Sequence, residues 1–493
     1  MKKVLLLLIA QSFFLPRASC QEKRLLTLEE AISIASQQSF DAFKNKNMYL
    51  ANYWQYRYFK ADRLPRLTLE ATPFDYNRSM QKVYNYDKNR DEYKSREDFN
   101  SELSLLLNQN IGLTGGRIFA RSELNLSQKL GSDNLSSYSS TPFSIGYSQS
   151  LNGYNRLRWT SKIEPLKFEK AKKEFVQSKE ALAIETSIRF FNLVDAQIEV
   201  KIAETNLANA DTLYTIGKGR FQVGTVTQDE LLNLELNFMN AKLAHTRAKL
   251  GLNRAQSDLN TFLGLPKEAG VECIIPTGLP DLTINSAEAL QMALSNNPEI
   301  IGYRQQMLEE DRKVKEAKSA NGVSGDLFAL YGLNQNSETF EEVYRDPLKR
   351  QRLRVGINIP ILDWGRRKGQ LAMAQSNREV VRISINQARN AFEQDVVMYV
   401  MEFNLQSEQV RNAAKADTIA QMGYDVTQQR FLIGKLKVTD LNLARNGQER
   451  AKRAYINALR SFWKYFFTIR QLTLFDFEKN IFLSEDFDRL INQ

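Results

Sequence analysis

The chain has 493 residues, of which 43% are hydrophobic and 25% charged, and its formal net charge is +10. This composition is that of a folded protein and excludes a disordered one. The excess of bases does not indicate nucleic-acid binding, because 57 acids are interspersed with 67 bases and no block of Lys and Arg stands out. We therefore expect solvated helix faces and no nucleic-acid partner.

The N-terminus has the pattern of a secretory signal peptide, which we place at residues 1–20. Two lysines precede the apolar run VLLLLIA, and small residues precede the expected cleavage site after Cys20. Lipidation of Cys20 is the alternative, although Arg17 stands where an apolar residue is expected. Beyond residue 20 no apolar stretch approaches the ~18–20 residues of a membrane-spanning helix. We expect an exported chain whose membrane crossings, where it has any, are β-strands.

The sequence offers few residues for catalysis or for a cofactor. Besides Cys20, the chain holds one cysteine, Cys273, and one histidine, His245. Metal clusters of Cys and His, and Ser-His or Cys-His nucleophiles, therefore lack their parts. Acids are too common for counting to exclude a carboxylate-pair hydrolase, but no pair stands out. We expect no enzyme activity, no cofactor and no metal site.

The chain contains a tandem duplication. The pentapeptides RFQVG (220–224) and RFLIG (430–434) lie 210 residues apart, whereas EAISIA (30–35) and EALQMA (288–293) lie 258 apart. The difference of 48 indicates an insertion in the first copy. We assign the chain to four parts, with the proline-containing linker between the copies: repeat 1 at 22–264, the linker at 265–281, repeat 2 at 282–475 and a C-terminal tail at 476–493.

Each repeat begins with a helix and continues with strands. In repeat 1 a helical pattern over 27–62 stops before Pro65, and a period of two follows within 66–151. The insertion adds a hairpin around 102–127, while the stretches 78–99 and 129–141 are polar and predict loops. In repeat 2 the alternation falls within 325–362. Strands with one apolar and one polar face are typical of half-buried sheets or of membrane barrels.

A long helical hairpin follows the strands of each repeat. In repeat 1 a helix from 155 to about 218 precedes a break at 217–228 and a second helix over 228–263. The second helix has two heptad columns three residues apart, as the a and d positions of a coiled coil are. Repeat 2 predicts the same hairpin, with its tip near 427–438. The columns are Leu231, Phe238, His245, Leu252 and Leu259, and Leu234, Ala241, Ala248, Ala255 and Phe262.

The two pentapeptides are the hairpin tips. Gly224 and Gly434 supply the backbone freedom that a reversal needs. Phe221 and Phe431 are placed to cover the end of the helix seam. His245 lies in a seam position without a second ligand, so we expect a packed histidine there.

This order of elements resembles the TolC-like outer-membrane efflux family over roughly residues 24–475. The residues that carry the resemblance are the two tips, in RFQVGTVTQDELLNLE and RFLIGKLKVTDLNLA, and the strand-to-helix passages LNGYNR and ILDWGRR. Tyr154, Trp364 and Gly365 stand in these passages. The opening segments LTLEEAISIA and AEALQMALSNNPEI also match, so the full set occurs twice in the same order.

The resemblance implies an α+β membrane protein that acts as a homotrimer. Its strands form one transmembrane β-barrel in the outer membrane, in contact with lipid, and its helices continue as an antiparallel coiled-coil barrel in the periplasm. The implied function is a passive exit duct for small toxic compounds. The implied partners are a periplasmic adaptor and an inner-membrane pump, either of the resistance-nodulation-division type or ATP-driven.

The resemblance also implies a closable entrance at the tips. Glu230 and Asp440, ten residues after each tip arginine, become rings of negative charge that favour cations. Arg220 and Arg430 are candidate partners in the links that close it. Where the second tip of the family commonly has a basic residue, this chain has Leu436, with Lys435 and Lys437 on either side.

Three alternatives stay open in the sequence. The trimer closes with more than twelve strands, or, as we expect, with twelve and an accessory hairpin outside the lipid. The channel serves drug efflux or type I secretion of a polypeptide. A secreted coiled-coil fibre would account for the heptads, but it leaves the strands and the duplication of mixed elements unexplained.

Overall fold

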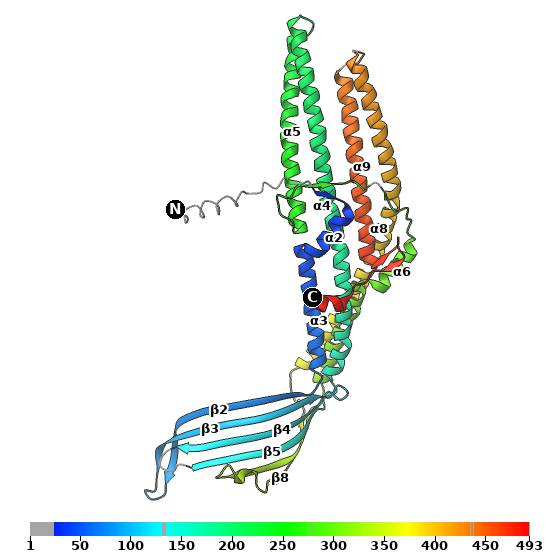
Figure 1. Cartoon of the computed structure of the whole chain (residues 1–493). Helices are drawn as coiled ribbons and strands as arrows, with labels where there is room; N and C mark the ends of the chain where they lie inside the picture. The colour runs from blue at the N-terminus through cyan, green and yellow to red at the C-terminus, as the bar shows by residue number, and fades with distance from the viewer. Residues whose placement is uncertain (1–23, 131–134, 277, 434, 437, 493) are drawn as a thin grey trace, which may run out of the picture. The chain divides into compact units, whose positions relative to one another are not determined.

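The computed structural model describes residues 24–130, 135–276, 278–433, 435–436 and 438–492. It divides into two compact units (Figure 1). The helical unit holds the described residues up to Tyr49, together with Lys172–Asn297 and Ala391 onward. The sheet unit holds Leu50–Ala171 and Pro298–Asn390. The predicted signal peptide and Cys20 lie outside the described residues.

Two helical hairpins, one from each half of the chain, dominate the helical unit (Figure 1). Both heptad columns predicted for the second helix of hairpin one are buried or half-buried along their whole length. The seam therefore follows the 3.5-residue period of the sequence. The first hairpin consists of α4 (Arg156–Gln222) and α5 (Gln228–Leu263), and the second of α8 (Arg366–Leu432) and α9 (Val438–Thr473).

Aromatic side chains form the core of the helical unit. Phe190, Phe191, Phe403 and Phe462 are all 0% exposed. The rings of Phe403 in α8 and Phe462 in α9 lie 5.2 Å apart. Burying a side chain of this size contributes roughly 1.5–3 kcal/mol, so this region is the best anchored part of the hairpins.

Each repeat opens with two short helices instead of one. The helix predicted over 27–62 is interrupted at Ser39, whose backbone is extended and ends the first helix. The second repeat has the same interruption at Asn297. These helices are α2 (Leu28–Gln38), α3 (Phe40–Ala61), α6 (Ser286–Asn296) and α7 (Pro298–Ala320).

Short elements complete the helical unit. The first strand of the chain pairs in parallel with the strand that follows α5. Two further strands pair antiparallel after α9. They are β1 (Arg24–Leu26), β6 (Val271–Cys273), β9 (Phe475–Asp476), β10 (Ile481–Phe482) and the helix α10 (Phe487–Asn492).

The sheet unit contains one antiparallel sheet of six strands in the order β2-β3-β4-β5-β7-β8 (Figure 1). Repeat 1 supplies four strands and repeat 2 supplies two, so β5 and β7 join the repeats. The outer strands β2 and β8 are the two edges of the sheet. The strands are β2 (Arg66–Asn85), β3 (Arg90–Asn110), β4 (Arg117–Leu130), β5 (Leu135–Ser150), β7 (Ser324–Ser337) and β8 (Leu348–Asn358), with a 3-10 turn at Glu342–Tyr344.

The loops expected at 78–99 and 129–141 are wrong, since the described part of 129–141 belongs to β4 and β5. The polar stretch 78–99 is mostly strand, because β2 and β3 stay paired as far as Asn85 and Arg90. The inserted hairpin at 102–127 is part of the sheet, in which β3 and β4 pair continuously. Ion pairs across the strands, such as Lys82 with Asp91 at 2.7 Å, hold polar residues in register there.

The two faces of the sheet differ in polarity. The register places the large aliphatic side chains of alternate positions on one face. Their exposed fractions lie between 39% and 74%, so the chain itself leaves this face uncovered. The large apolar residues of this face are Leu67, Leu69, Leu103, Leu105, Leu107, Ile118, Ile145, Leu353, Val355 and Ile357, together with the aromatic Tyr331.

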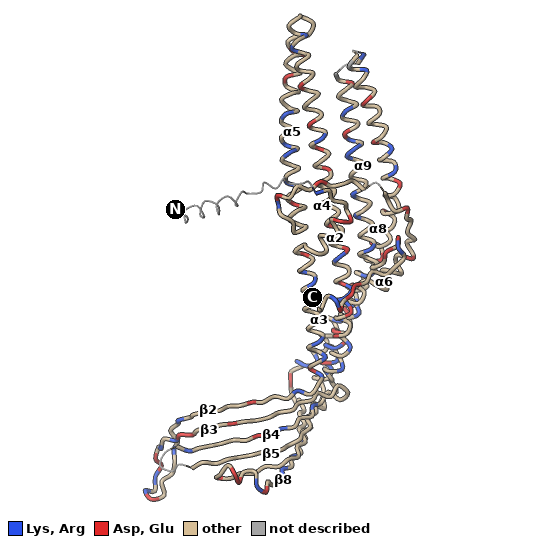
Figure 2. The backbone as a smooth tube through the Cα atoms, viewed as in Figure 1, with Lys and Arg blue, Asp and Glu red and all other residues tan. Residues whose placement is uncertain are grey.

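Charged residues of both signs are intermixed along the helical hairpins (Figure 2). This distribution agrees with the solvated helix faces expected from the composition. None of the helices in the described ranges is long and apolar enough to cross a membrane.

Candidate functional site

The first hairpin reverses between Gln222 and Gln228. The amide of Thr225 donates to the carbonyl of Arg220 at 2.9 Å, and the amide of Gly224 donates to the carbonyl of Phe221 at 3.0 Å. These two bonds form a Schellman motif, which requires a left-handed residue at its turn. Gly224 supplies that residue, with φ of 75°. The repeated glycine of the pentapeptide is therefore a backbone requirement of the tip.

The second tip closes in the same way. The amide of Lys435 donates to the carbonyl of Arg430 at 2.9 Å, which is the bond of the first tip displaced by 210 residues. Phe431 is half-buried at the end of α8. Gly434 and Lys437 lie outside the described residues, so the structure gives no account of either one.

The two predicted acids begin the second helix of each hairpin. Glu230 forms a capping box, in which its carboxylate accepts from the amide of Thr227 at 3.2 Å. The Thr227 hydroxyl accepts from the Glu230 amide at 3.4 Å. A hydrogen bond from Thr227 lowers the pKa of the neighbouring Asp229. Asp440 occupies the first turn of α9 and has an interaction partner within the chain.

The basic and apolar tip residues face solvent in the single chain. Arg220, Arg430 and Lys435 are exposed, and within the described ranges no ion pair joins them to a carboxylate. The tip of hairpin one also exposes apolar surface, with Phe221 41% and Val223 73% exposed. The structure therefore leaves both the charges and the apolar groups of the tips available to other molecules.

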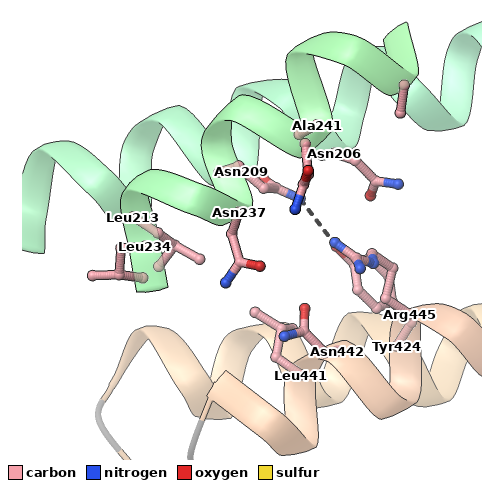
Figure 3. A pocket seen from close by; sticks show the side chains of 13 residues that line it. Asn206, Asn209, Leu213, Leu234, Asn237, Ala241, Tyr424, Leu441, Asn442 and Arg445 are labelled. Atoms are coloured by element: carbon pink, nitrogen blue, oxygen red, sulfur yellow. Dashed lines mark hydrogen bonds between the residues drawn. The ribbon is translucent and has the colours of Figure 1, made fainter. Parts of the chain in front are cut away.

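A cavity of about 270 Å³ lies between the two hairpins (Figure 3). The sequence did not indicate this cavity, because its walls come from four helices far apart in the chain. Asparagines are its most frequent lining residue. They are Asn206 and Asn209 of α4, Asn237 and Asn240 of α5, and Asn442 of α9.

Hydrogen bonds cross this cavity from one hairpin to the other. The Asn209 side-chain amide donates to the Tyr424 hydroxyl at 3.2 Å (Figure 3). The Asn206 amide donates to the carboxylate of Glu449 at 2.9 Å. Closer to the aromatic core, Arg453 forms an ion pair with Glu199.

The contact between the hairpins thus changes character along its length. Near the fully buried Phe190 and Phe403 the contact includes a largely buried ion pair between Arg470 of α9 and Glu180 of α4 at 2.9 Å. Toward the tips it consists of exchangeable hydrogen bonds, each worth about 0.5–1.5 kcal/mol net. Separating the tip halves of the hairpins therefore requires much less free energy than separating the halves that contain the aromatic core.

The strand-to-helix passages are capped turns. The Asn155 side chain accepts from the amide of Arg158 at 3.0 Å and so caps α4. The Asp363 carboxylate accepts from the amides of Gly365 and Arg367 at 3.1 and 3.3 Å and caps α8. Capping by Asn or Asp directly before a helix is a signal that the sequence carried.

The predicted passage residues take different roles in the two repeats. Trp364 and Gly365 are both left-handed, with φ of 54° and 82°, and Trp364 is 89% exposed. Tyr154 is half-buried, and burial together with the nearby charge of Glu316 raises its pKa. In repeat 1 the left-handed residue is Gly153, with φ of 71°.

The described residues contain no group of three or more Asp, Glu, His or Cys that could hold a metal ion. Cys273 is buried in β6, and burial raises the pKa of its thiol to about 12. His245 is half-buried in the seam of α5, and its Nε2 has no hydrogen-bond partner within the described part of the chain.

Comparison with known proteins gives a family and a fold. A family model described as Outer membrane efflux protein matches residues 110–265 and 289–473. The CmeC outer membrane channel of Campylobacter jejuni is similar in structure, with a TM-score of 0.66 and 17% identity over 94% of this chain and 88% of that one. The outer membrane protein VceC of Vibrio cholerae is similar with a TM-score of 0.59 and 13% identity, over 91% of this chain and 95% of VceC. The open state of the MtrE channel of Neisseria gonorrhoeae is similar with a TM-score of 0.59 and 16% identity, over 90% of this chain and 88% of MtrE. No sequence among the curated proteins matches the chain.

Proposed function

The chain belongs to the outer membrane efflux protein family, and we propose that it forms the passive exit duct of a tripartite efflux system. The observation that carries the proposal is that one chain contains both a sheet with an uncovered aliphatic face and long helical hairpins. A sheet with an uncovered aliphatic face suits lipid, and helical hairpins with exposed tips suit a water-filled periplasm.

The free edges of the sheet support assembly into a trimer. An unpaired strand edge is not tolerated in lipid, and the outer edges of β2 and β8 have no partner strand in the single chain. Pairing β8 of one copy with β2 of the next closes the sheet. Six strands from each of three copies make a barrel of eighteen, so the inserted hairpin widens the barrel.

The tips form the entrance in this proposal. Three copies bring Glu230 and Asp440 into rings of negative charge, and the asparagine-lined contact between hairpins lets the tips move apart. The test is Glu230→Gln with Asp440→Asn, measured as the reversal potential across a planar bilayer. Gln keeps the capping box while the charge is lost, so folding is preserved. Loss of cation preference supports the rings, whereas an unchanged reversal potential contradicts them.

A periplasmic adaptor is the partner that the tips fit. The exposed Phe221, Val223 and Ile433 offer apolar contacts, and the exposed Arg220 and Arg430 add one positive charge to each tip. The energy for transport comes from an inner-membrane pump through this adaptor. The kind of inner-membrane protein that co-purifies separates drug efflux from type I polypeptide secretion.

Passive flux is the direct test of the duct. Liposomes that contain the protein should release trapped glucose without any energy source, while protein-free liposomes retain it. The variant Asn206→Ala with Tyr424→Phe, which loosens the tips, should release it faster. Retention of glucose by liposomes with the unmodified protein and by liposomes with the variant would contradict the proposed passive duct.

A further inference from the structure

The register of the sheet gathers arginines into one belt. On the polar face, three consecutive rows of paired residues contain six arginines. The rows run from one edge of the sheet to the other at the end where the strands meet the helices. We call these six residues the basic belt: Arg66 of β2, Arg117 and Arg121 of β4, and Arg350, Arg352 and Arg354 of β8.

No carboxylate lies within the three rows. One row holds Asn110, Arg117, Ser148, Phe328 and Arg354; the next holds Arg66, Asn108, Phe119, Gly146, Leu330 and Arg352; the third holds Thr68, Leu106, Arg121, Ser144, Gly332 and Arg350. Alternate residues of a strand are roughly 7 Å apart, so the belt is about 14 Å high.

Carboxylates gather in the rows that follow toward the far end of the sheet. They are Glu70, Glu123, Glu102, Asp75 and Asp98. Over these rows the polar face is divided into a basic zone and an acidic zone, and mixed charge begins only at the row in which Asp98 pairs with Lys129. A face that needed only to be soluble would mix the two signs.

Two ion pairs compensate part of the belt. Arg121 lies 3.2 Å from Glu123, and Arg354 lies 3.7 Å from Asp326, with Arg354 and Asp326 both 58% exposed. Exposed pairs of this kind are weak. Within the described ranges, the other four arginines have no ion pair with a carboxylate.

An aromatic pair lies in the middle of the belt. The rings of Phe119 and Phe328 are stacked with centroids 5.7 Å apart. The guanidinium groups of Arg352 and Arg354 lie 6.0 and 5.6 Å from the Phe328 centroid. The Phe119 ring lies against Gly146, where a side chain would not fit: a Cβ added to Gly146 would come within 2.2 Å of the ring. The belt thus combines cationic donors with an aromatic surface.

We propose that the basic belt binds organic anions in transit, namely carboxylates, sulfonates or phosphates that carry an aromatic group. The proposal rests on the proposed function, because the polar face lines the lumen only when the aliphatic face meets lipid. Guanidinium groups bind such anions in charge-assisted, bidentate bonds, and the phenylalanine pair contacts their rings. In a trimer the belt holds eighteen arginines around one passage.

Protection of the sheet edge is a weaker explanation of these arginines. Charged side chains on an edge strand do prevent unwanted pairing, and β8 is an edge. However, Arg117 and Arg121 stand on β4, which has a paired strand on both sides. Edge protection also predicts no effect on ion selectivity.

The test compares two matched sets of neutral variants in planar bilayers. The first set is Arg350→Gln, Arg352→Gln and Arg354→Gln together; the second is Glu70→Gln, Glu102→Gln and Glu123→Gln. We expect the first set to lower the chloride-to-potassium permeability ratio by ~2-fold or more in 0.1 M salt, and the second to raise it. The differences should shrink in 1 M salt, because the Debye length falls from about 10 Å to about 3 Å.

Benzoate is the probe for binding itself. We expect benzoate to reduce the current of the unmodified channel, and the arginine variant to need a several-fold higher concentration for the same reduction. Equal permeability ratios and equal sensitivity to benzoate in the unmodified and arginine-variant channels would contradict anion binding by the basic belt. Should the triple variant fail to insert, Arg352→Gln alone gives the same comparison. A complete absence of conductance in the unmodified protein would instead contradict the proposed duct.

Discussion

The polar contact between the hairpins sets how easily the tips separate. We consider the double change Asn206→Ala with Tyr424→Phe, which removes the bonds of 2.9 and 3.2 Å that cross the cavity. Each bond is worth about 0.5–1.5 kcal/mol net, and the aromatic core that anchors the hairpins is untouched. A combined loss of about 1–3 kcal/mol raises the ratio of open to closed tips roughly 5- to 150-fold.

The assay is the open probability of single channels in a planar bilayer. Tyr455→Phe is the matched control, because the Tyr455 hydroxyl makes no hydrogen bond to a described residue. We expect longer openings in the double variant and unmodified behaviour in the control. A double variant that keeps its thermal stability and opens no more often than the control would show that these hydrogen bonds do not hold the tips closed.

Three further outcomes follow from local geometry. Gly219→Ala meets open space and should stabilise the helix by up to about 1 kcal/mol in thermal unfolding. Gly217→Ala should gain less, because its Cβ would meet Leu234 Cδ1 at 2.5 Å and the leucine side chain must move. Asp363→Ala removes the cap of α8 and should cost about 0.5–2 kcal/mol in the same assay. The buried Cys273 thiol should resist maleimide at pH 8 until the protein is denatured. Folding raises the pKa of this thiol from 9.0 to about 12, so the unfolded chain loses the proton first. The free energy of unfolding should therefore fall as the pH increases through that interval.

Elements with a strong local period could be predicted from the sequence. The second helix of hairpin one was expected over 228–263 and occupies Gln228–Leu263, because heptad spacing and a capping residue both act within a few residues. The turn at Gly224 was predictable for the same reason. The helix expected over 27–62 was wrong in one detail, since Ser39 interrupts it.

Features that depend on a distant partner could not be predicted. The stretch 78–99 looked like a loop because its residues are polar, yet ion pairs such as Arg78 with Glu97 at 3.2 Å stabilise it as paired strand. Asn209 looked like a solvated helix residue, and only the folded hairpins place it against Tyr424. The basic belt likewise depends on strand register, which joins residues hundreds of positions apart.

The roles of the tip charges are still proposals. The structure shows Glu230 engaged in a capping box and Arg220 exposed without a carboxylate partner in the described ranges. A capping role and a place in a ring of charge are compatible, because the carboxylate keeps its charge while it accepts a hydrogen bond. Only neighbouring copies would bring the predicted rings together.

Single-channel conductance of the purified mature protein in a planar bilayer, recorded across a salt gradient, tests the duct most directly. We expect small, stable conductance steps whose size increases when the tip contacts are weakened. A protein that remains soluble without detergent and never inserts would contradict it, because the aliphatic face of the sheet would then have no lipid to meet.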